Sequence, residues 1–235
     1  MTASETQLRV ATVDDAVVLA DLYTGARVAA VPAMPPAVHT NAEDRAWFTA
    51  RLDDGDHEAW LAEDDGELVG YALFTRTWLD HLFIRPDRTG DGLGALLLDI
   101  VKSLRPEGFC LWVFEQNERA RAFYRGHGLI ELDRTDGSGN EERTPDVRMA
   151  WPGTDPLGFL RALIDDVDHE LGGLLARRAA LTAAVQPHKS AAERDPERER
   201  EIAVRMAAQA PTLGEDRLGR IVHAIITESL GAAGH

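Results

Sequence analysis

The fold is most tightly constrained in the last third of the chain, where apolar residues recur at helical spacing and no strand pattern appears. This apolar stripe runs from Leu157 to Val185 and predicts a helix of about eight turns. Pro187 should kink or end that helix, and the Gly172-Gly173 pair should weaken it by roughly 1 kcal/mol per glycine. A helix this long in a small module needs an equally long partner to pack against.

Two shorter helices are predicted after the long one. Asp195 is a strong N-cap residue, and the proline that follows it suits the first helical position. The two residues predict a helix that runs to about Ala210. A turn at residues 211–214 leads into a last helix over about 215–230. We therefore expect an all-helical module of three helices over residues 157–235.

Residues 7–150 alternate between a period of two and a period of about 3.6, which indicates mixed α and β structure. At 235 residues the chain is long enough for two domains, each with its own core. Residues 151–156 contain two prolines and a glycine, which mark the junction between the two domains. The expected domains are residues 1–152 and 157–235, joined by a linker at 153–156.

The composition excludes several classes of partner. A net charge of −15 argues against nucleic acid. Cys110, the only cysteine, lies in an apolar run and is predicted to be a buried strand residue without a disulfide or metal partner. The sequence begins with no signal-peptide pattern, and no apolar run reaches membrane-spanning length. We expect a cytoplasmic protein with no membrane partner and no metal site.

Three alternate glycines, Gly90, Gly92 and Gly94, follow a predicted strand that ends at Ile84 and open a predicted helix. Such a turn exposes backbone N–H groups at a helix N-terminus, where hydrogen bonds and the helix dipole stabilise a pyrophosphate. Tight turns that bind no ligand share this pattern, so the glycines alone leave both interpretations open.

The segments Ile84–Gly94 and Leu111–Leu129 together resemble the acyl-CoA loop and the second signature of the GNAT acetyltransferase family. The resemblance covers about residues 5–152. It implies an α+β GNAT fold with a mixed central sheet and flanking helices. In this fold acetyl-CoA binds where two neighbouring strands of the sheet splay apart. It assigns to this cofactor Leu82, Ile84, Arg88, Thr89, Gly90, Gly92, Leu93, Gly94 and Asn117. Thr89 stands where the family usually has Arg or Gln, and the adjacent Arg88 is the candidate replacement.

The same resemblance makes Tyr124 the acid that protonates the departing CoA thiolate. Asn117 either contacts the cofactor, caps the following helix, or does both. An amine acceptor must lose a proton before it attacks the thioester, and the candidate bases are Glu115 and Asp80 near the strand ends. Both are equally compatible with solvated strand-end carboxylates. The loops that select the acceptor, at about residues 31–40 and 135–144, do not identify it.

A sparse row of charged side chains lies on the helical pattern, namely Arg161, Arg178, Lys189, Asp195, Arg198 and Glu199. On an ideal helix Arg178 and Lys189 return to within about 20° of the same face at a rise of about 16 Å. Arg161 lies about 100° off that face and about 25 Å away, so it cannot serve the same site within one chain. Individually, each residue is equally compatible with an ordinary solvated helix charge.

This row, together with Ser229, resembles the active-site pattern of the all-helical chorismate mutase family over about residues 157–231. The resemblance implies an intertwined three-helix homodimer that binds a chorismate-like dianion. Arg178 and the partner's Arg161 would bind its two carboxylates in bidentate fashion. Lys189 would bridge a carboxylate and the ether oxygen, where a compact ammonium suits the developing charge. Asp195, Arg198 and Glu199 would contact the ring hydroxyl, and Ser229 completes the substrate-binding set.

One residue of that pattern is missing. Ala233 falls where the family usually has Gln or Glu to hydrogen-bond the ether oxygen. A preorganised donor of this kind is worth roughly 3 kcal/mol, so the rate or the substrate is expected to differ from those of a standard mutase.

We therefore interpret the chain as a bifunctional enzyme. The helical module would catalyse the Claisen rearrangement of chorismate to prephenate, or of a close relative, without a cofactor, as part of the shikimate pathway to aromatic amino acids. The first domain would transfer acetyl from acetyl-CoA to an unknown amine. Alternatives for the helical module are a 4-amino-4-deoxychorismate mutase, an isochorismate-pyruvate lyase, or a non-catalytic dimerisation or chorismate-sensing module that regulates the acetyltransferase. A further alternative makes the acetyltransferase half a vestige.

Overall fold

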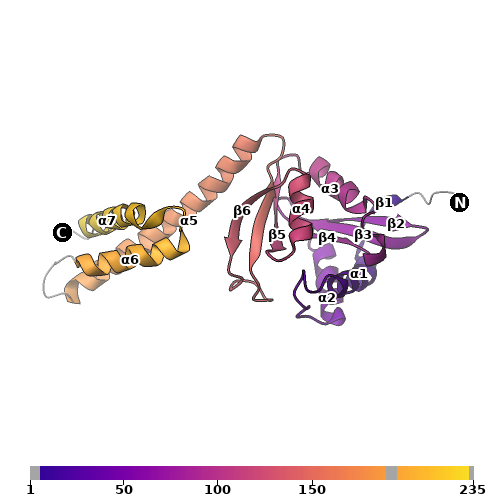
Figure 1. The fold of residues 1–235 in the computed structure, drawn as a ribbon, viewed down its shortest axis with the longest axis horizontal. Helices are drawn as coiled ribbons and strands as arrows, with labels where there is room; N and C mark the ends of the chain where they lie inside the picture. Colours follow the sequence, from indigo (N-terminus) through magenta and orange to yellow (C-terminus); the bar gives the residue numbers. More distant parts are fainter. Residues whose placement is uncertain (1–5, 189–194, 233–235) are drawn as a thin grey trace. The chain divides into compact units, whose positions relative to one another are not determined.

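The computed structural model describes residues 6–188 and 195–232 (Figure 1). The chain divides into two compact units, residues 1–160 and 161–235. The long helix α5 (Pro156–Val185) begins in the first unit and continues into the second. We describe each unit by itself.

The first unit contains two antiparallel sheets. One has the order β1-β2-β3-β4, and the other has the order β5-β7-β6. Their strands are β1 (Gln7–Val10), β2 (Glu58–Asp64), β3 (Glu67–Phe74), β4 (Leu79–Ile84), β5 (Phe109–Phe114), β6 (Ile130–Thr135) and β7 (Asp146–Trp151). The sheets meet through a parallel bridge between Trp78 and Cys110, where the amide of Cys110 donates to the carbonyl of Thr77 at 2.8 Å. The mixed sheet expected from the sequence is confirmed, and its halves separate beyond this bridge.

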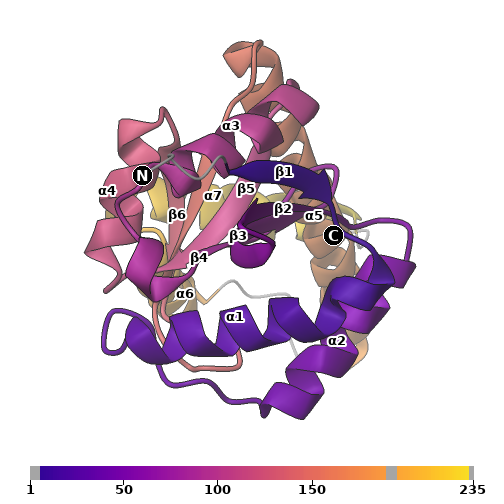
Figure 2. The ribbon, with the colours of Figure 1, turned by 90° about the vertical axis from the view of Figure 1, so that its right-hand side faces the viewer.

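Helices cover both faces of the strands in this unit. They are α1 (Ala16–Ala29), α2 (Asn41–Asp53), α3 (Leu93–Leu104) and α4 (Glu118–Gly126), with short 3-10 turns at Val13–Asp15 and Pro86–Arg88. Figure 2 shows α1 and α2 on one side of the strands and α3 on the other. Each side has its own core: Leu19 and Phe48 pack with Tyr71 on the first, and Leu97 packs with Phe109 on the second. Cys110 is 3% exposed in β5, as the sequence predicts.

The second unit consists of helices in its described part, as the sequence predicts. Helix α5 ends at Val185, and a 3-10 turn follows at Gln186–His188. Then come α6 (Pro196–Gln209) and α7 (Gly214–Ala232), which lie side by side (Figure 1). The Asp195 side chain caps α6 by accepting from the amide of Arg198 at 3.0 Å. Helices α6 and α7 bury residues against each other, whereas α5 buries none.

Candidate active sites

A cavity of about 660 Å³ opens in the first unit where β4 and β5 separate. Residues of β4 and β5 form much of its wall, together with Tyr124 of α4 (Glu118–Gly126) and Asn117, the N-cap of that helix. The volume lies within the range of small-molecule sites. The cavity therefore occurs at the splay between strands where the sequence resemblance places the cofactor.

The glycine turn after β4 adopts a conformation that other residues rarely reach. Gly90 has a φ of 102° and Gly92 a φ of 85°, and Gly92 is the N-cap of α3. Positive φ favours glycine, because a Cβ would clash with the backbone. The first amides of α3 have no intrahelical acceptor, so they can donate to an anion at this helix end. The local geometry thus fits a pyrophosphate.

Arg88 is already engaged by two carboxylates. Its guanidinium donates to Asp64 at 2.6 Å and to Asp91 at 2.8 Å. Thr89 donates its hydroxyl to the carbonyl of Pro86 at 2.8 Å, inside the turn. Arg88, the candidate replacement for the family's Arg or Gln, therefore stabilises the loop in this conformation. The backbone amides of the turn are then the main hydrogen-bond donors for an anion.

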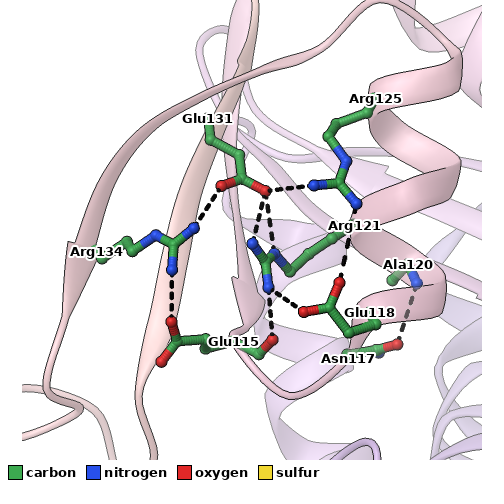
Figure 3. Close-up of polar contacts among 8 residues, drawn as sticks. All are labelled: Glu115, Asn117, Glu118, Ala120, Arg121, Arg125, Glu131 and Arg134. Carbon is green, nitrogen blue, oxygen red and sulfur yellow. Dashed lines mark hydrogen bonds and ion pairs between the residues drawn. The ribbon is translucent and has the colours of Figure 1, made fainter.

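Tyr124 combines burial with access to the cavity. It is 9% exposed, belongs to the core beside Phe123, and lines the cavity wall. Burial raises the pKa of Tyr124 well above its ordinary value, so the hydroxyl keeps its proton at neutral pH. Asn117 lines the same cavity and caps α4 by accepting from the amide of Ala120 at 3.1 Å (Figure 3). The capping interpretation of Asn117 is thus confirmed, and its place in the cavity is compatible with the second role.

The structure separates the two candidate bases. Asp80 lines the cavity, and burial raises the pKa of its carboxyl group. It occupies the extra position of a β-bulge, since Leu73 pairs with His81 and Phe74 pairs with Leu79. Glu115 does not line this cavity, and its side chain is 43% exposed. Asp80 is therefore the better-placed of the two candidate bases.

Glu115 belongs instead to an ion-pair network between α4 and β6 (Figure 3). Its carboxylate accepts from Arg134 at 2.7 Å, and Arg134 also donates to Glu131 at 3.0 Å. Arg121, which is 5% exposed, donates to Glu131 and to the backbone carbonyl of Glu115. This network accounts for Glu115 as a structural residue.

His81 lines the cavity but was not singled out from the sequence. Its ring stacks on Tyr23 and Trp47, and its Nδ1 lies 3.0 Å from the hydroxyl of Tyr71. Burial lowers the pKa of His81 to about 3, so the ring is neutral at physiological pH. The sequence shows His81 only as a polar residue next to Asp80 in an apolar strand, and Tyr23, Trp47 and Tyr71, which surround its ring, lie on other elements.

Two loops expected to select the acceptor both contribute to the cavity wall. Met34 comes from the loop before α2, and Glu142 comes from the loop between β6 and β7. Arg27 of α1 is 5% exposed and donates to Glu142 at 2.8 Å and to the carbonyl of Pro35 at 3.1 Å. A buried arginine therefore ties the two loops together beside the cavity.

In the second unit, the structure brings two of the sequence-predicted residues together. The guanidinium of Arg178 on α5 donates to the hydroxyl of Ser229 on α7 at 2.7 Å. The same nitrogen lies 3.4 Å from the carbonyl of Ile225, and Ser229 donates to that carbonyl at 2.6 Å. Ser229 is 6% exposed, so it orients the arginine from a buried position.

The other predicted residues of this unit are more dispersed. Glu199 lines a pocket of about 430 Å³ between α6 and α7, and its carboxylate lies 3.6 Å from Nδ1 of His223. Neither Arg178 nor Ser229 lines that pocket. Arg161 is exposed on α5, 17 residues before Arg178 on the same continuous helix, which separates them by about 25 Å. A single chain therefore does not assemble the whole predicted site.

Two of the predicted positions, Lys189 and Ala233, lie outside the described residues. The ideal-helix estimate that placed Lys189 on the same face as Arg178 does not apply, because α5 ends at Val185 and the 3-10 turn at Gln186–His188 has a different pitch. Pro187 lies in that turn, where it cannot donate an α-helical hydrogen bond.

No cluster of three or more His, Cys, Asp or Glu side chains is placed to hold a metal ion in the described ranges. None of the described helices combines the length and the hydropathy that a membrane span requires.

Comparison with known families assigns both units. The acetyltransferase (GNAT) family matches residues 26–129, and chorismate mutase type II matches residues 160–232. An uncharacterized N-acetyltransferase of Archaeoglobus fulgidus is 32% identical over 110 residues, which cover 40% of this chain and 72% of that protein. The chain therefore belongs to the GNAT acetyltransferase family and carries a chorismate mutase type II domain over residues 160–232.

The peptidyl-lysine N-acetyltransferase YjaB of Salmonella typhimurium is 34% identical over 94 residues, 40% of this chain. The matched region spans 64% of the length of YjaB. Among solved structures, apo YjaB from Escherichia coli has a TM-score of 0.52 at 24% identity and covers 64% of this chain and 99% of its own. A GCN5-related N-acetyltransferase from Rhodopseudomonas palustris has a TM-score of 0.53 at 24% identity, with 65% and 98% covered. These structural likenesses establish the fold.

Proposed function

We propose that the protein is a bifunctional enzyme in which residues 1–152 transfer acetyl from acetyl-CoA to an amine and residues 157–235 rearrange a chorismate-like dianion, with a linker at 153–156. The observation that carries the first activity is the cavity between β4 and β5, with the glycine turn at the N-terminus of α3 nearby. The observation that carries the second is the Arg178–Ser229 contact at 2.7 Å within the matched family region.

Acetyl-CoA fits the first unit, because positive-φ glycines and free helix amides are suited to a pyrophosphate. When bound, it supplies an activated acetyl group as a thioester. Asp80 removes a proton from the acceptor ammonium, which frees the nitrogen lone pair for attack. Tyr124, protonated at neutral pH because burial raises its pKa, donates its proton to the leaving sulfur. Asn117 borders the cavity and orients the bound cofactor while it caps α4.

The acceptor is an amine, and the side chain of a peptidyl lysine is one candidate, because YjaB is a peptidyl-lysine N-acetyltransferase. The test is acetyl transfer from acetyl-CoA to a panel of small amines and lysine peptides, followed by mass spectrometry. Asp80→Asn should lower kcat/KM at least tenfold, since it removes the base. Glu115→Gln is the matched control and should stay within about twofold. The reverse ranking would reject Asp80 as the base.

In the helical unit, a Claisen rearrangement requires a folded substrate and stabilisation of charge as the ether bond breaks. Arg178, oriented by Ser229, binds one carboxylate, and Lys189 bridges a carboxylate and the ether oxygen. Asp195, Arg198 and Glu199 contact the ring substituent. No cofactor is needed in this scheme, because the reacting bonds lie within one substrate molecule.

The second carboxylate is bound by Arg161 of the partner subunit in a homodimer. The support for a second copy is the uncovered apolar surface of α5, whose exposed residues include Ile164, Val167, Leu171, Leu174 and Leu181. Apolar surface of this extent, at helical spacing, favours association with an equally long helix. The same association would bring Arg161 of one chain toward Arg178 of the other, which resolves their separation of about 25 Å along a single helix.

Three substrates differ in what they demand of this site: chorismate, 4-amino-4-deoxychorismate and isochorismate. Incubation with each, with mass-resolved product analysis, distinguishes rearrangement from elimination of pyruvate. We expect rearrangement by the wild type and a loss of at least about 100-fold in Lys189→Ala, because one charge-stabilising donor is worth roughly 3 kcal/mol. No turnover of any of the three would reject catalysis and favour a sensing or dimerisation role for the helices.

A further inference from the structure

A second carboxylate and a histidine lie directly behind Asp80, on elements far from it in the sequence. Asp54 is the C-cap of α2, and His57 lies just before β2. The Asp54 carboxylate lies 2.7 Å from Nδ1 of His57, and its other oxygen accepts the amides of Asp56 and His57 at 2.9 and 3.0 Å. These contacts hold both the carboxylate and the imidazole ring in place.

The opposite edge of the ring faces the proposed base. Nε2 of His57 lies 3.6 Å from Oδ2 of Asp80. The His57 side chain is 12% exposed, whereas those of Asp54 and Asp80 are 25% and 32% exposed. Asp80 lines the cavity from its bulge position. The three side chains therefore form a line from the cavity, through a shielded imidazole, to a second carboxylate.

The hydrogen bond to Asp54 determines what the imidazole can do. Since a carboxylate accepts, Nδ1 of His57 carries a proton and donates it to Asp54. In the neutral ring, Nε2 then has a lone pair directed toward Asp80. A histidine held in this way by a carboxylate can take up a proton from its other side, and the carboxylate stabilises the resulting imidazolium.

The other charged and titratable groups near Asp80, His57 and Asp54 are compatible with proton transfer from Asp80 to His57. Arg51 on α2 lies 3.5 Å from Asp54 and 5.2 Å from the centre of the Trp47 ring, and its charge favours the ionised form of Asp80. His81, on the strand beside Asp80, stays neutral because burial lowers its pKa to about 3. Burial raises the pKa of Asp80 above that of an ordinary aspartate. The imidazole of His57, 3.6 Å away, can take up the proton that this carboxyl group accepts.

We propose that His57, held by Asp54, is a positioning and proton-relay residue for Asp80 in acetyl transfer. This inference rests on the proposed acetyltransferase function. The acceptor ammonium gives one proton to Asp80, which passes it to Nε2 of His57. Asp54 stabilises the resulting imidazolium, which releases the same proton to solvent after acetyl transfer. The nitrogen lone pair then forms the C–N bond as the C–S bond breaks. The sulfur takes a proton from Tyr124, which the reacting nitrogen restores as it loses its second proton.

The test uses the full chain and the fastest amine of the panel. His57→Asn keeps a donor near Asp54 but cannot relay a proton, so kcat/KM should fall about tenfold or more, and the acidic limb of its pH profile should change shape. Asp54→Asn should change the profile in the same direction. His169→Asn, an exposed histidine on α5, is the matched control and should leave both unchanged. Equal binding of CoA and an equal Tm would exclude misfolding.

A chemical rescue separates the relay from a structural role. In His57→Ala, added imidazole should restore part of the rate in proportion to its free-base concentration, because it can occupy the vacated space and carry the proton. An active wild type with an unchanged rate and pH profile in His57→Asn would overturn the relay and leave the acetyltransferase intact. Loss of rate without a change in the pH profile and without rescue by imidazole would also overturn it. A wild type that acetylates none of the amines would overturn both proposals.

Discussion

In the first unit, helices cover both faces of the strands, and the cavity is lined by residues of one chain. In the second unit, α6 and α7 pack together, while α5 leaves Val167, Leu171 and Leu174 between 47% and 59% exposed. Soluble proteins rarely keep such an apolar stripe uncovered. This difference supports the proposal that the first site is complete within one chain, whereas the second needs another copy.

Because of this difference, we expect the two sites to respond differently to mutation. A change on α5 should affect assembly and rearrangement together and leave acetyl transfer intact. A change in the cavity should affect acetyl transfer alone. All five tryptophans lie between residues 47 and 151, so intrinsic fluorescence reports on the first unit only.

The largest expected effect is that of a carboxylate placed on the uncovered face of α5. Leu171→Asp would bury an unpaired charge in the proposed dimer, and symmetry places it there twice, at a cost of several kcal/mol. We expect a monomer by light scattering and a loss of rearrangement of at least about 1000-fold. Leu104→Asp, on an exposed apolar residue of α3, is the control. A dimer that survives Leu171→Asp would place the interface elsewhere.

The next largest effect concerns the two adjacent arginines of α5. Arg178→Ala removes the guanidinium that Ser229 orients, and loss of a charged contact with a carboxylate typically costs 2–5 kcal/mol. Rearrangement should fall by about 100-fold or more, as measured by substrate consumption at saturating and limiting concentrations. Arg177→Ala, an exposed neighbour, should change it by less than about twofold. Equal effects of the two changes would mean that the arginines act only through general charge.

A smaller effect is expected at Tyr124. A thiolate is a good leaving group, so loss of its acid in Tyr124→Phe should lower kcat of acetyl transfer by roughly 10- to 100-fold, at or below the lower bound typical of general acid catalysis. The KM for acetyl-CoA and the rate of rearrangement should stay within about twofold. A fall in both activities would show that the two units are coupled, which the comparison above does not predict.

The smallest effect is on stability against acid. His81 has a pKa of about 3 in the folded chain, below the ordinary histidine value of about 6.5. Between these values the unfolded chain binds a proton that the folded chain does not, so stability falls as the pH decreases, by about 1.4 kcal/mol per pH unit. Urea titrations followed by tryptophan fluorescence should show this slope from about pH 6 to pH 4. His81→Gln should reduce it, and an unchanged slope would assign it to other groups.

Local signals predicted much of the fold, because they act over a few residues. Pro187 and Asp195 mark the end of α5 and the start of α6, as helix-breaking and capping chemistry requires. The glycine turn was predicted for a similar reason, since Gly90 and Gly92 adopt backbone angles that other residues avoid.

Contacts between residues far apart in the sequence could not be predicted from local patterns. The choice between Asp80 and Glu115 depends on a bulge in β4 and on Arg134 of another strand. His57 is 23 positions from Asp80, and nothing in the local pattern joins them. Arg88 was predicted to contact the cofactor, and its ion pair with Asp64 could not be predicted because Asp64 lies on β2. The sequence predicts which side chains carry chemistry, and tertiary packing determines which of them meet.

The most direct test of the central claim is complementation between two inactive chains. Arg161→Ala and Arg178→Ala each damage every site of a homodimer that shares these residues across subunits. A mixed dimer keeps one site with both arginines, so an equimolar, fully exchanged mixture should regain about one quarter of the wild-type rearrangement rate, as expected for symmetric shared sites. A rate no higher than that of either variant alone would contradict the account and show that the two arginines do not share a site across subunits.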